Sequence, residues 1–225
     1  MDQHVSTTSF TMAVAELMSR VACHAVAGNE FDEVCRLRHD AYKREESLPE
    51  GTPRRFSDQY DLLSNTTTFG LYVDDTLAGS LRIHVIDRET PESPATSAFP
   101  DFVGQWIDAG HRLVDGTRFV VDAGASRRHP NVAYLVARIA WMAGQFYDAD
   151  WIITTCRLEH QAFYRRVFGH EVMCPPRSYP HLTKPQGLLR LDQRRRMPLV
   201  HARYPFFAST EHERRALFER TVAGG

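Results

Sequence analysis

Arginines inside otherwise apolar, strand-like runs are the residues of this chain best suited to chemistry. Arg118 and Arg82 both lie in such runs, and Arg38 lies in a helix-like stretch upstream. A buried arginine is costly unless an acid neutralises it, and the nearest paired acids are Asp58 and Asp61. The sequence therefore predicts that these charged groups converge on one cavity: Arg38, Asp58, Asp61, Arg82 and Arg118.

The run 117–122 alternates β-branched and aromatic residues with charged ones, which predicts a strand. Because side chains alternate across a strand, Arg118 and Asp122 are expected on one face. A guanidinium can hold a carboxylate through two parallel hydrogen bonds, so these arginines suit an acidic ligand. The alternative is structural: the arginines only join strands through ion pairs, and Asp58 and Asp61 serve as a helix N-cap and a surface acid.

Composition narrows the class of protein. The chain has 225 residues, 43% of them hydrophobic and 24% charged, which fits one ordinary globular domain. A formal net charge of -1 provides no general attraction to nucleic acid or to an anionic membrane. The four scattered cysteines, without a metal-binding spacing, indicate reduced thiols in a cytoplasmic protein and no metal site.

Three segments are predicted: an N-terminal amphipathic helix in residues 1–30, a core in residues 31–193 and a C-terminal extension in residues 194–225. The apolar stretch 10–26 is too polar to span a bilayer because Glu16, Arg20 and His24 interrupt it. No integral membrane segment is therefore expected.

The C-terminal extension holds two features. A charged stretch at 211–220 is predicted to form a solvated helix that caps the fold, and the aromatic cluster 204–207 is assigned to packing.

The core alternates strand-like and helix-like segments. Turn residues Asp74 and Asp75 between two strand patterns predict a hairpin. The order hairpin, strand, helix, strand, helix, strand predicts an α/β sandwich whose mixed central sheet has helices on both faces, with the Arg118 strand central and beside the Trp151 strand. Helices are expected at 32–46, 101–109, 131–147 and 159–168, and strands at 67–73, 77–86, 117–122, 151–155, 171–174 and 188–192.

This layout resembles the GNAT (general N-acetyltransferase) superfamily. The text 159–169 is similar to the late helix of that fold, whose tyrosine often protonates the leaving thiolate, and Tyr164 occupies that position. The usual phosphate loop, R/Q-x-x-G-x-G/A, is absent, and residues 122–128 fill its place.

A closer resemblance is to the acyl-homoserine-lactone synthases and the N-acyl amino acid synthases. The matching positions are Leu37-Arg38 with Tyr42, Asp58 with Asp61, Arg82, and the strand from Arg118 to Asp122. Asp115 stands where the lactone synthases have a glutamate, and their usual tryptophan after the first helix is missing. The texts 157–166, 176–180 and 184–185 look more like the N-acyl amino acid synthases.

The resemblance implies an acyltransferase that moves a fatty acyl chain from an acyl-carrier-protein thioester to the α-amine of an amino acid. The acyl-phosphopantetheine thioester would be a co-substrate, with no other cofactor, and the partners would be the carrier protein and the amino acid. The implied catalytic residues are Asp115, Asp122, Tyr164 and Arg118, with His111 as a further candidate base. The implied substrate-binding residues are Arg38, Asp58, Asp61 and Arg82, and the implied carrier-protein contacts are Arg127, Arg128 and Arg165.

Three alternatives remain open from the sequence. One is an acyl-homoserine-lactone synthase that uses S-adenosylmethionine, and another is an acetyltransferase that uses acetyl-coenzyme A. The third is a catalytically idle GNAT-like domain that binds a ligand or regulates a partner. The acyl chain length, the amino acid and the oligomeric state are left open as well.

Overall fold

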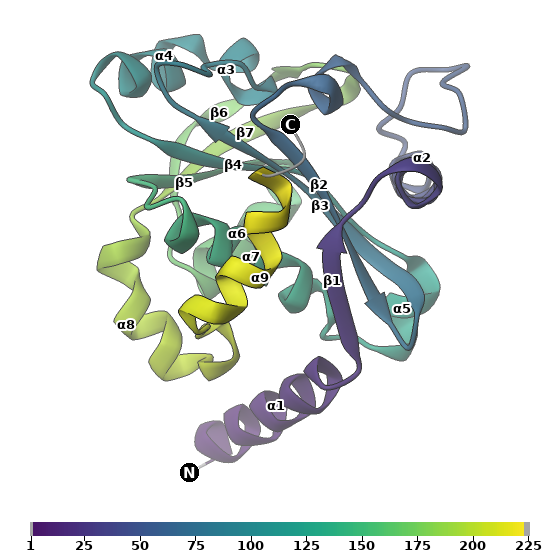
Figure 1. Ribbon diagram of the computed structural model, residues 1–225, viewed down its shortest axis with the longest axis vertical. Coiled ribbons are helices and arrows are strands. Elements are labelled where there is room, and N and C mark those ends of the chain that lie inside the picture. Colours follow the sequence, from purple (N-terminus) through teal and green to yellow (C-terminus); the bar gives the residue numbers. More distant parts are fainter. Residues whose placement is uncertain (1, 223–225) are drawn as a thin grey trace.

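A mixed seven-stranded sheet forms the centre of the molecule (Figure 1). The computed structural model describes the backbone of residues 2–222 and the side chains of residues 9–219. The strand order is β1-β2-β3-β4-β5-β7-β6, and every neighbouring pair is antiparallel except β4 with β5. The strands are β1 (Val21–Ala25), β2 (Thr66–Val73), β3 (Thr76–Ile86), β4 (Leu113–Val121), β5 (Trp151–Cys156), β6 (Glu171–Tyr179) and β7 (Leu182–Leu191).

Helices cover both faces of this sheet, and the predicted α/β sandwich is confirmed. Helices α2 (Gly28–Arg44), α3 (Pro94–Ala98) and α4 (Pro100–Asp108) lie on one face. Helix α6 (Val132–Phe146) packs on the other, where α9 (Glu211–Val222) crosses it in Figure 1. The remaining helices are α1 (Asp2–Met18), α5 (Ala123–Arg128), α7 (Gln161–Val167) and α8 (Gln193–Arg203), with short 3-10 turns η1 (Gln59–Leu62), η2 (Leu158–His160) and η3 (Pro205–Phe207).

The predicted hairpin between β2 and β3 is confirmed. Asp74 and Asp75 both have positive φ, +47° and +60°, as a tight two-residue turn between twisted strands requires. Aspartate tolerates this conformation better than most residues do. The hairpin sets Thr68 directly opposite Arg82, which fixes the position of that arginine.

A bulge in β4 shapes the middle of the sheet. Arg82 pairs with Thr117 and Ser80 pairs with Val120, so two residues of β4, Arg118 and Phe119, oppose one residue of β3. Arg118 takes a left-handed backbone with φ +52°. Because the bulge interrupts the alternation, the spacing of Arg118 and Asp122 alone does not fix the face that each side chain takes.

Strands β4 and β5 separate close to this bulge, beyond Gly116. Their parallel pairing joins 113–116 to 151–154 and continues no further, although both strands are longer. Beyond Gly116 the two strands lean apart, as expected where a bulge bends one of them. The gap between them opens toward α2, α5 and α7, and it positions the site described below.

Both ends of the chain differ from prediction. The N-terminal helix ends at Met18 instead of filling residues 1–30, and Val21–Ala25 pairs with β2 as an edge strand that half-buries every second residue. Helix α9 is more than a solvated cap, because Phe218 is fully buried against Phe69 at 5.4 Å between ring centroids. Packing explains both errors, since each segment covers apolar surface of β2 or α6.

None of the helices within the described residues is long and apolar enough to cross a membrane.

Candidate active site

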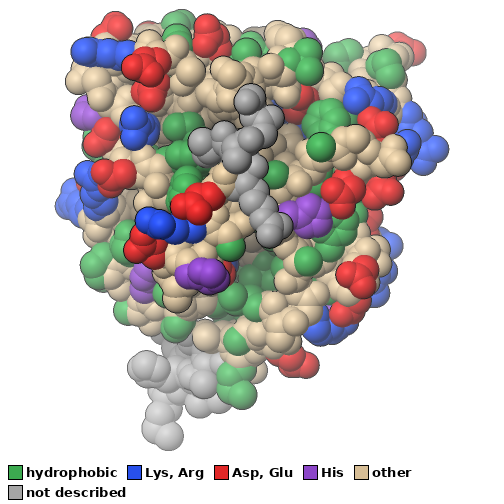
Figure 2. Space-filling model, viewed as in Figure 1, with side chains coloured by type: hydrophobic (Ala, Val, Ile, Leu, Met, Phe, Trp, Pro, Cys, Tyr) green, Lys and Arg blue, Asp and Glu red, His purple; other side chains and the backbone are tan. Residues whose placement is uncertain are grey.

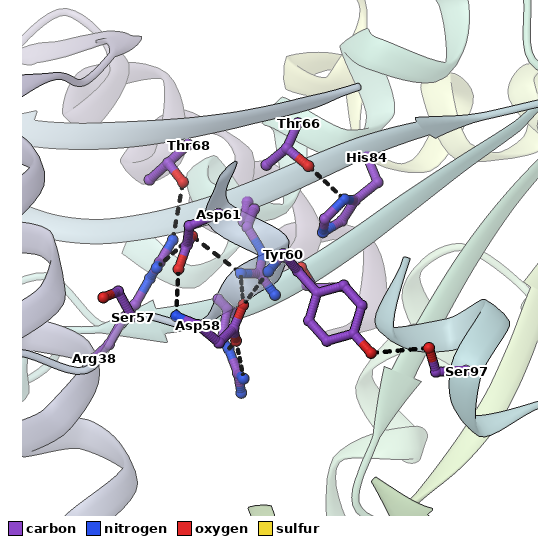
Figure 3. Close-up of polar contacts among 12 residues, drawn as sticks. Arg38, Ser57, Asp58, Tyr60, Asp61, Thr66, Thr68, His84 and Ser97 are labelled. Carbon is purple, nitrogen blue, oxygen red and sulfur yellow. Dashed lines mark hydrogen bonds and ion pairs between the residues drawn. The ribbon is translucent and has the colours of Figure 1, made fainter. Parts of the chain in front are cut away.

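The five charged residues expected to converge meet in one buried network. Figure 3 labels three of them, Arg38, Asp58 and Asp61. Arg38 of α2 donates to the Asp61 carboxylate at 2.8 Å, and Arg82 of β3 donates to Asp58 at 2.7 Å. Arg82 also lies 3.0 Å from Asp61, and Arg118 of β4 binds the second oxygen of Asp58. All five side chains are between 0 and 2% exposed.

The acids of this network also build their own turn. Asp58 is the N-cap of η1 and accepts from the Tyr60 amide, while Asp61 accepts from the Asp58 amide. This reciprocal capping orients both carboxylates independently of their contacts with the arginines. The structural interpretation of Asp58 as an N-cap is therefore correct, but neither acid lies on the surface.

Electrostatics hold the acids ionised. Burial alone would raise the pKa of Asp58, but the charges of Arg82 and Arg118 outweigh it and lower that pKa. The pKa of Asp61 is lowered in the same way, because the charges of Arg38 and Arg82 outweigh the effect of burial. Three guanidinium groups thus face two carboxylates, and the network carries an excess of one positive charge. Two threonine hydroxyls accept further hydrogen bonds from the arginines: Thr68 of β2 accepts from Arg38 and Thr117 of β4 accepts from Arg82, each at 3.0 Å.

Beside the network lies a cavity of about 570 Å³ where β4 and β5 separate. Arg118 lines it, whereas Arg38, Asp58, Asp61 and Arg82 lie behind its wall. The four residues predicted to bind substrate therefore do not line the cavity. Their charged groups pair with one another and are shielded from it. The charged side chains that line the cavity are Arg44, Glu45, Arg118, Arg127 and Arg157, and the His160 imidazole lines it as well.

Arg157 and Glu45 were not assigned a role by the sequence. Arg157 donates to the Glu45 carboxylate at 2.8 Å across the cavity mouth, and His160 lies beside both. The pKa of Glu45 is lowered, first by His160 and then by Arg157 against the effect of burial. Glu45 follows α2 by one residue and Arg157 follows β5, so no periodic pattern marks them.

Tyr164 lines the cavity from α7, as its predicted role requires. It also borders a narrow apolar slot that continues from the cavity between β4 and α6 and shares Gly116 and Phe119 with it. Burial raises the pKa of Tyr164, so its phenol keeps its proton at neutral pH. Such a group can donate a proton to a leaving thiolate.

The remaining predicted acids lie elsewhere. Asp122 does not line the cavity, because it caps α5 by accepting from the Ala125 amide at 2.7 Å. His111 lies at the opposite end of β4, 3.5 Å from Asp150. Asp115 is fully buried beneath the sheet, and neither of its oxygens has a hydrogen-bond partner among the described residues. Burial raises its pKa to about 7.

One thiol also lines the cavity, at Cys156. Burial raises its pKa to about 12, so it stays protonated and is a weak nucleophile at neutral pH. Direct attack of an amine on a bound thioester fits this cavity better than an acyl-cysteine intermediate.

Of the three arginines predicted to contact a carrier protein, one lines the cavity and two do not. Arg127 lines it, whereas Arg128 on α5 and Arg165 on α7 are exposed outside its lining. Their role as partner contacts stays a prediction.

Comparison with known proteins gives a family. The model of the family described as N-acyl amino acid synthase FeeM matches residues 33–192. No curated protein matches the chain. The solved structure of FeeM, an N-acyl amino acid synthase from uncultured soil microbes, is 20% identical with a TM-score of 0.67, covering 81% of this chain and 98% of that one.

Two further structures share the fold at lower identity. The coenzyme-A-dependent acyl-homoserine lactone synthase MesI is 15% identical with a TM-score of 0.58, covering 84% of this chain and 97% of that one. An acyl-CoA N-acyltransferase from Pseudomonas aeruginosa is 16% identical with a TM-score of 0.51, covering 76% and 97%. Given the family match over most of its length, this chain belongs to the FeeM family of N-acyl amino acid synthases.

Proposed function

We propose that this protein transfers a fatty acyl chain from a thioester to the α-amine of an amino acid. The observation that carries the proposal is the cavity between β4 and β5, with arginines at its mouth and an apolar slot behind it, in a chain of the FeeM family. A thioester is already activated, so the enzyme needs chiefly to position a neutral amine and to receive the thiolate.

The lining of the cavity suits both substrates. The slot, bordered by Leu81, Trp141 and Phe168, is apolar but has a volume of only about 30 Å³, so a fatty acyl chain would lie mainly in the cavity and would enter the slot only if it widens. Arg118 and Arg157 can hold the carboxylate of an amino acid, and Glu45 can face its ammonium group. Tyr164, at the junction of cavity and slot, is placed to protonate the thiolate.

The donor we propose is an acyl chain on the phosphopantetheine of an acyl carrier protein, and no other cofactor is required. In α5, the Ala125 amide is already bonded to the Asp122 carboxylate. That negative charge would oppose the pyrophosphate of coenzyme A at this position. A cytoplasmic location agrees with a carrier-protein donor and with the four free cysteines.

A second candidate is transfer from acyl-coenzyme A. It is favoured by the similar folds of MesI, a coenzyme-A-dependent acyl-homoserine lactone synthase, and of the acyl-CoA N-acyltransferase from Pseudomonas aeruginosa. The cluster of Arg44, Arg127 and Arg157 at the cavity mouth could also contact phosphates.

Mass spectrometry of reactions with purified protein tests the proposal. Acyl-carrier protein or acyl-coenzyme A is supplied with a mixture of amino acids, or with S-adenosylmethionine, and Arg118→Ala serves as the inactive control. The expected product is an N-acyl amino acid that Arg118→Ala forms at least tenfold more slowly. A lactone would instead favour a homoserine-lactone synthase, and no acylated product from any donor would favour a binding module.

A further inference from the structure

A polar path leads from the wall of the cavity into the interior of the protein. Thr155 of β5 lines the cavity, and its hydroxyl donates to the phenol oxygen of Tyr179 at 2.9 Å. Tyr179 ends β6 and is buried. Since its oxygen already accepts the threonine proton, its own proton is free to be donated further inward.

Asp115 lies on the same side of the sheet as this pair. It pairs with Ile153 of β5, and Thr155 is two residues further along that strand, so their side chains share one face. Burial raises the pKa of Tyr179, and the Asp115 charge is the next largest cause of that rise. The carboxylate and the phenol are therefore close enough to interact electrostatically.

Burying the Asp115 carboxyl group at this position costs free energy of folding. Neither carboxylate oxygen makes a hydrogen bond of ordinary length and angle among the described residues, although Ser93 and the Ala95 amide lie near enough to lower its pKa, so its burial is poorly compensated. The titratable and charged groups that face it are Arg82 and His84 of β3 and Tyr179 of β6, while Ser93 and the Ala95 amide approach it from α3. Burial also lowers the pKa of His84, which stays neutral, so Asp115 is the acceptor of protons in this group.

We propose that Thr155 and Tyr179 conduct the proton released by the acceptor amine to Asp115, which is the base at the end of the relay. As the amine nitrogen bonds to the thioester carbonyl carbon, its proton passes to the Thr155 hydroxyl. The Thr155 proton passes to Tyr179, and the Tyr179 proton passes on to Asp115, whose charge already acts on that phenol. The carbon–sulfur bond then breaks, and the thiolate takes the proton of Tyr164. Asp115 returns its proton to solvent and Tyr164 takes one from solvent, so the enzyme regains its starting state. This inference rests on the proposed function.

Conservative variants of the relay test it. Thr155→Val and Tyr179→Phe should each lower kcat by about a hundredfold, as expected for lost proton transfer, with KM changed less than threefold. Thr155→Ser should restore kcat because it restores the hydroxyl. The double variant Thr155→Val/Tyr179→Phe should be no slower than the single ones, because the two groups act in series.

A matched control separates the relay from a structural loss. Tyr60 is also buried and its hydroxyl bonds Ser97 at 2.8 Å, but it does not line the cavity. Tyr60→Phe removes the same kind of bond and should leave kcat within twofold. The pH profile gives an independent readout: kcat of the wild type should rise through an apparent pKa of about 7, and this rise should be absent in Asp115→Asn.

The proposal is overturned if Tyr179→Phe behaves like Tyr60→Phe, if the losses in the double variant multiply, or if Asp115→Asn keeps the rise in the pH profile. These results require an active wild type. A wild type that forms no N-acyl amino acid would contradict the proposed function itself, so the two failures are distinguishable.

Discussion

Arg118 is the one member of the buried network that lines the cavity, and Asp58, itself paired with Arg82, holds its guanidinium. Its left-handed backbone is unusual for a residue with a side chain and would be strained in isolation. Asp58 binds its guanidinium, while Phe56 and Tyr42 flank it at 4.6 and 5.5 Å from the ring centroids. These contacts present a fixed cation to the cavity.

Removing Arg82 tests how much the fold depends on this network. Arg82→Ala leaves Asp58 and Asp61 buried with one partner fewer each, and we expect a loss of about 3–5 kcal/mol of unfolding free energy. Urea unfolding followed by circular dichroism measures it. The control is Arg20→Ala, which breaks the exposed, solvent-screened pair with Asp74 and should cost far less stability than Arg82→Ala. Equal losses in the two variants would contradict a stabilising network.

The buried acid Asp115 predicts a dependence of stability on pH. Its pKa is raised to about 7 in the folded protein, so the folded state holds this proton where the unfolded state has lost it. The contribution is full below the unfolded pKa and is lost as pH rises through the folded pKa, a fall of about 2–3 kcal/mol between pH 5 and pH 8. Asp115→Asn should remove that fall. Unfolding of both proteins at the two pH values measures it, and parallel changes would exclude this ionisation.

At the scale of elements, the sequence predicted β3 and α6 closely because their apolar periodicity is strong. It began β4 at residue 117 instead of Leu113, because Asp115 and Gly116 are unfavourable residues in strands. It missed the bulge at Arg118, because an inserted residue changes register without changing composition. It also ended β6 at residue 174, since Pro175 and Pro176 suggest a loop. β6 is an edge strand, where proline is tolerated, and only the complete sheet reveals that.

The C-terminal helix gives the prediction that belongs to this scale. Its polar sequence suggested solvation, yet Phe218 inserts between Phe69 and Phe146, at 5.4 and 5.2 Å. Phe218→Ala should therefore cost about 3–5 kcal/mol of unfolding free energy, as expected for a large buried side chain. Leu199→Ala, at an exposed position of α8, is the control and should cost less than about 1 kcal/mol. A Phe218→Ala protein as stable as its control would mean that α9 does not anchor the fold.

At the scale of the molecule, the net charge is close to zero, but several arginines gather around the cavity. Figure 2 shows acidic and basic side chains interspersed on the face that α9 crosses, in line with a formal net charge of -1. The arginines that line the cavity come from α2, β4, α5 and the turn after β5. The sequence could predict that distant charged motifs meet, because buried charges need partners. Which of them reaches the cavity depends on the bulge in β4 and on the separation of β4 from β5, neither of which a periodic pattern encodes.

This local charge leads to a prediction about the donor. Arg128 and Arg165 are exposed on α5 and α7, the helices that border the cavity beside Arg127 and Tyr164. An acidic carrier protein docked there would deliver its phosphopantetheine arm into the cavity, and exposed arginines would act mainly on the rate of encounter. Arg128→Glu and Arg165→Glu should each lower kcat/KM for acyl-carrier protein by about tenfold at low salt, and the wild-type kcat/KM should fall as salt is raised.

Two controls test this prediction: a charge reversal away from the cavity and a donor without a carrier protein. Arg215→Glu reverses a charge on α9, which contributes nothing to the lining of the cavity, and it should leave kcat/KM within twofold. Turnover with free acyl-coenzyme A should be slower in the wild type and insensitive to Arg165→Glu, because no acidic protein surface is involved. Equal use of the two donors, with no effect of salt and none of charge reversal at Arg128, would assign the donor to coenzyme A. The arginines at the cavity mouth would then be contacts for its phosphates.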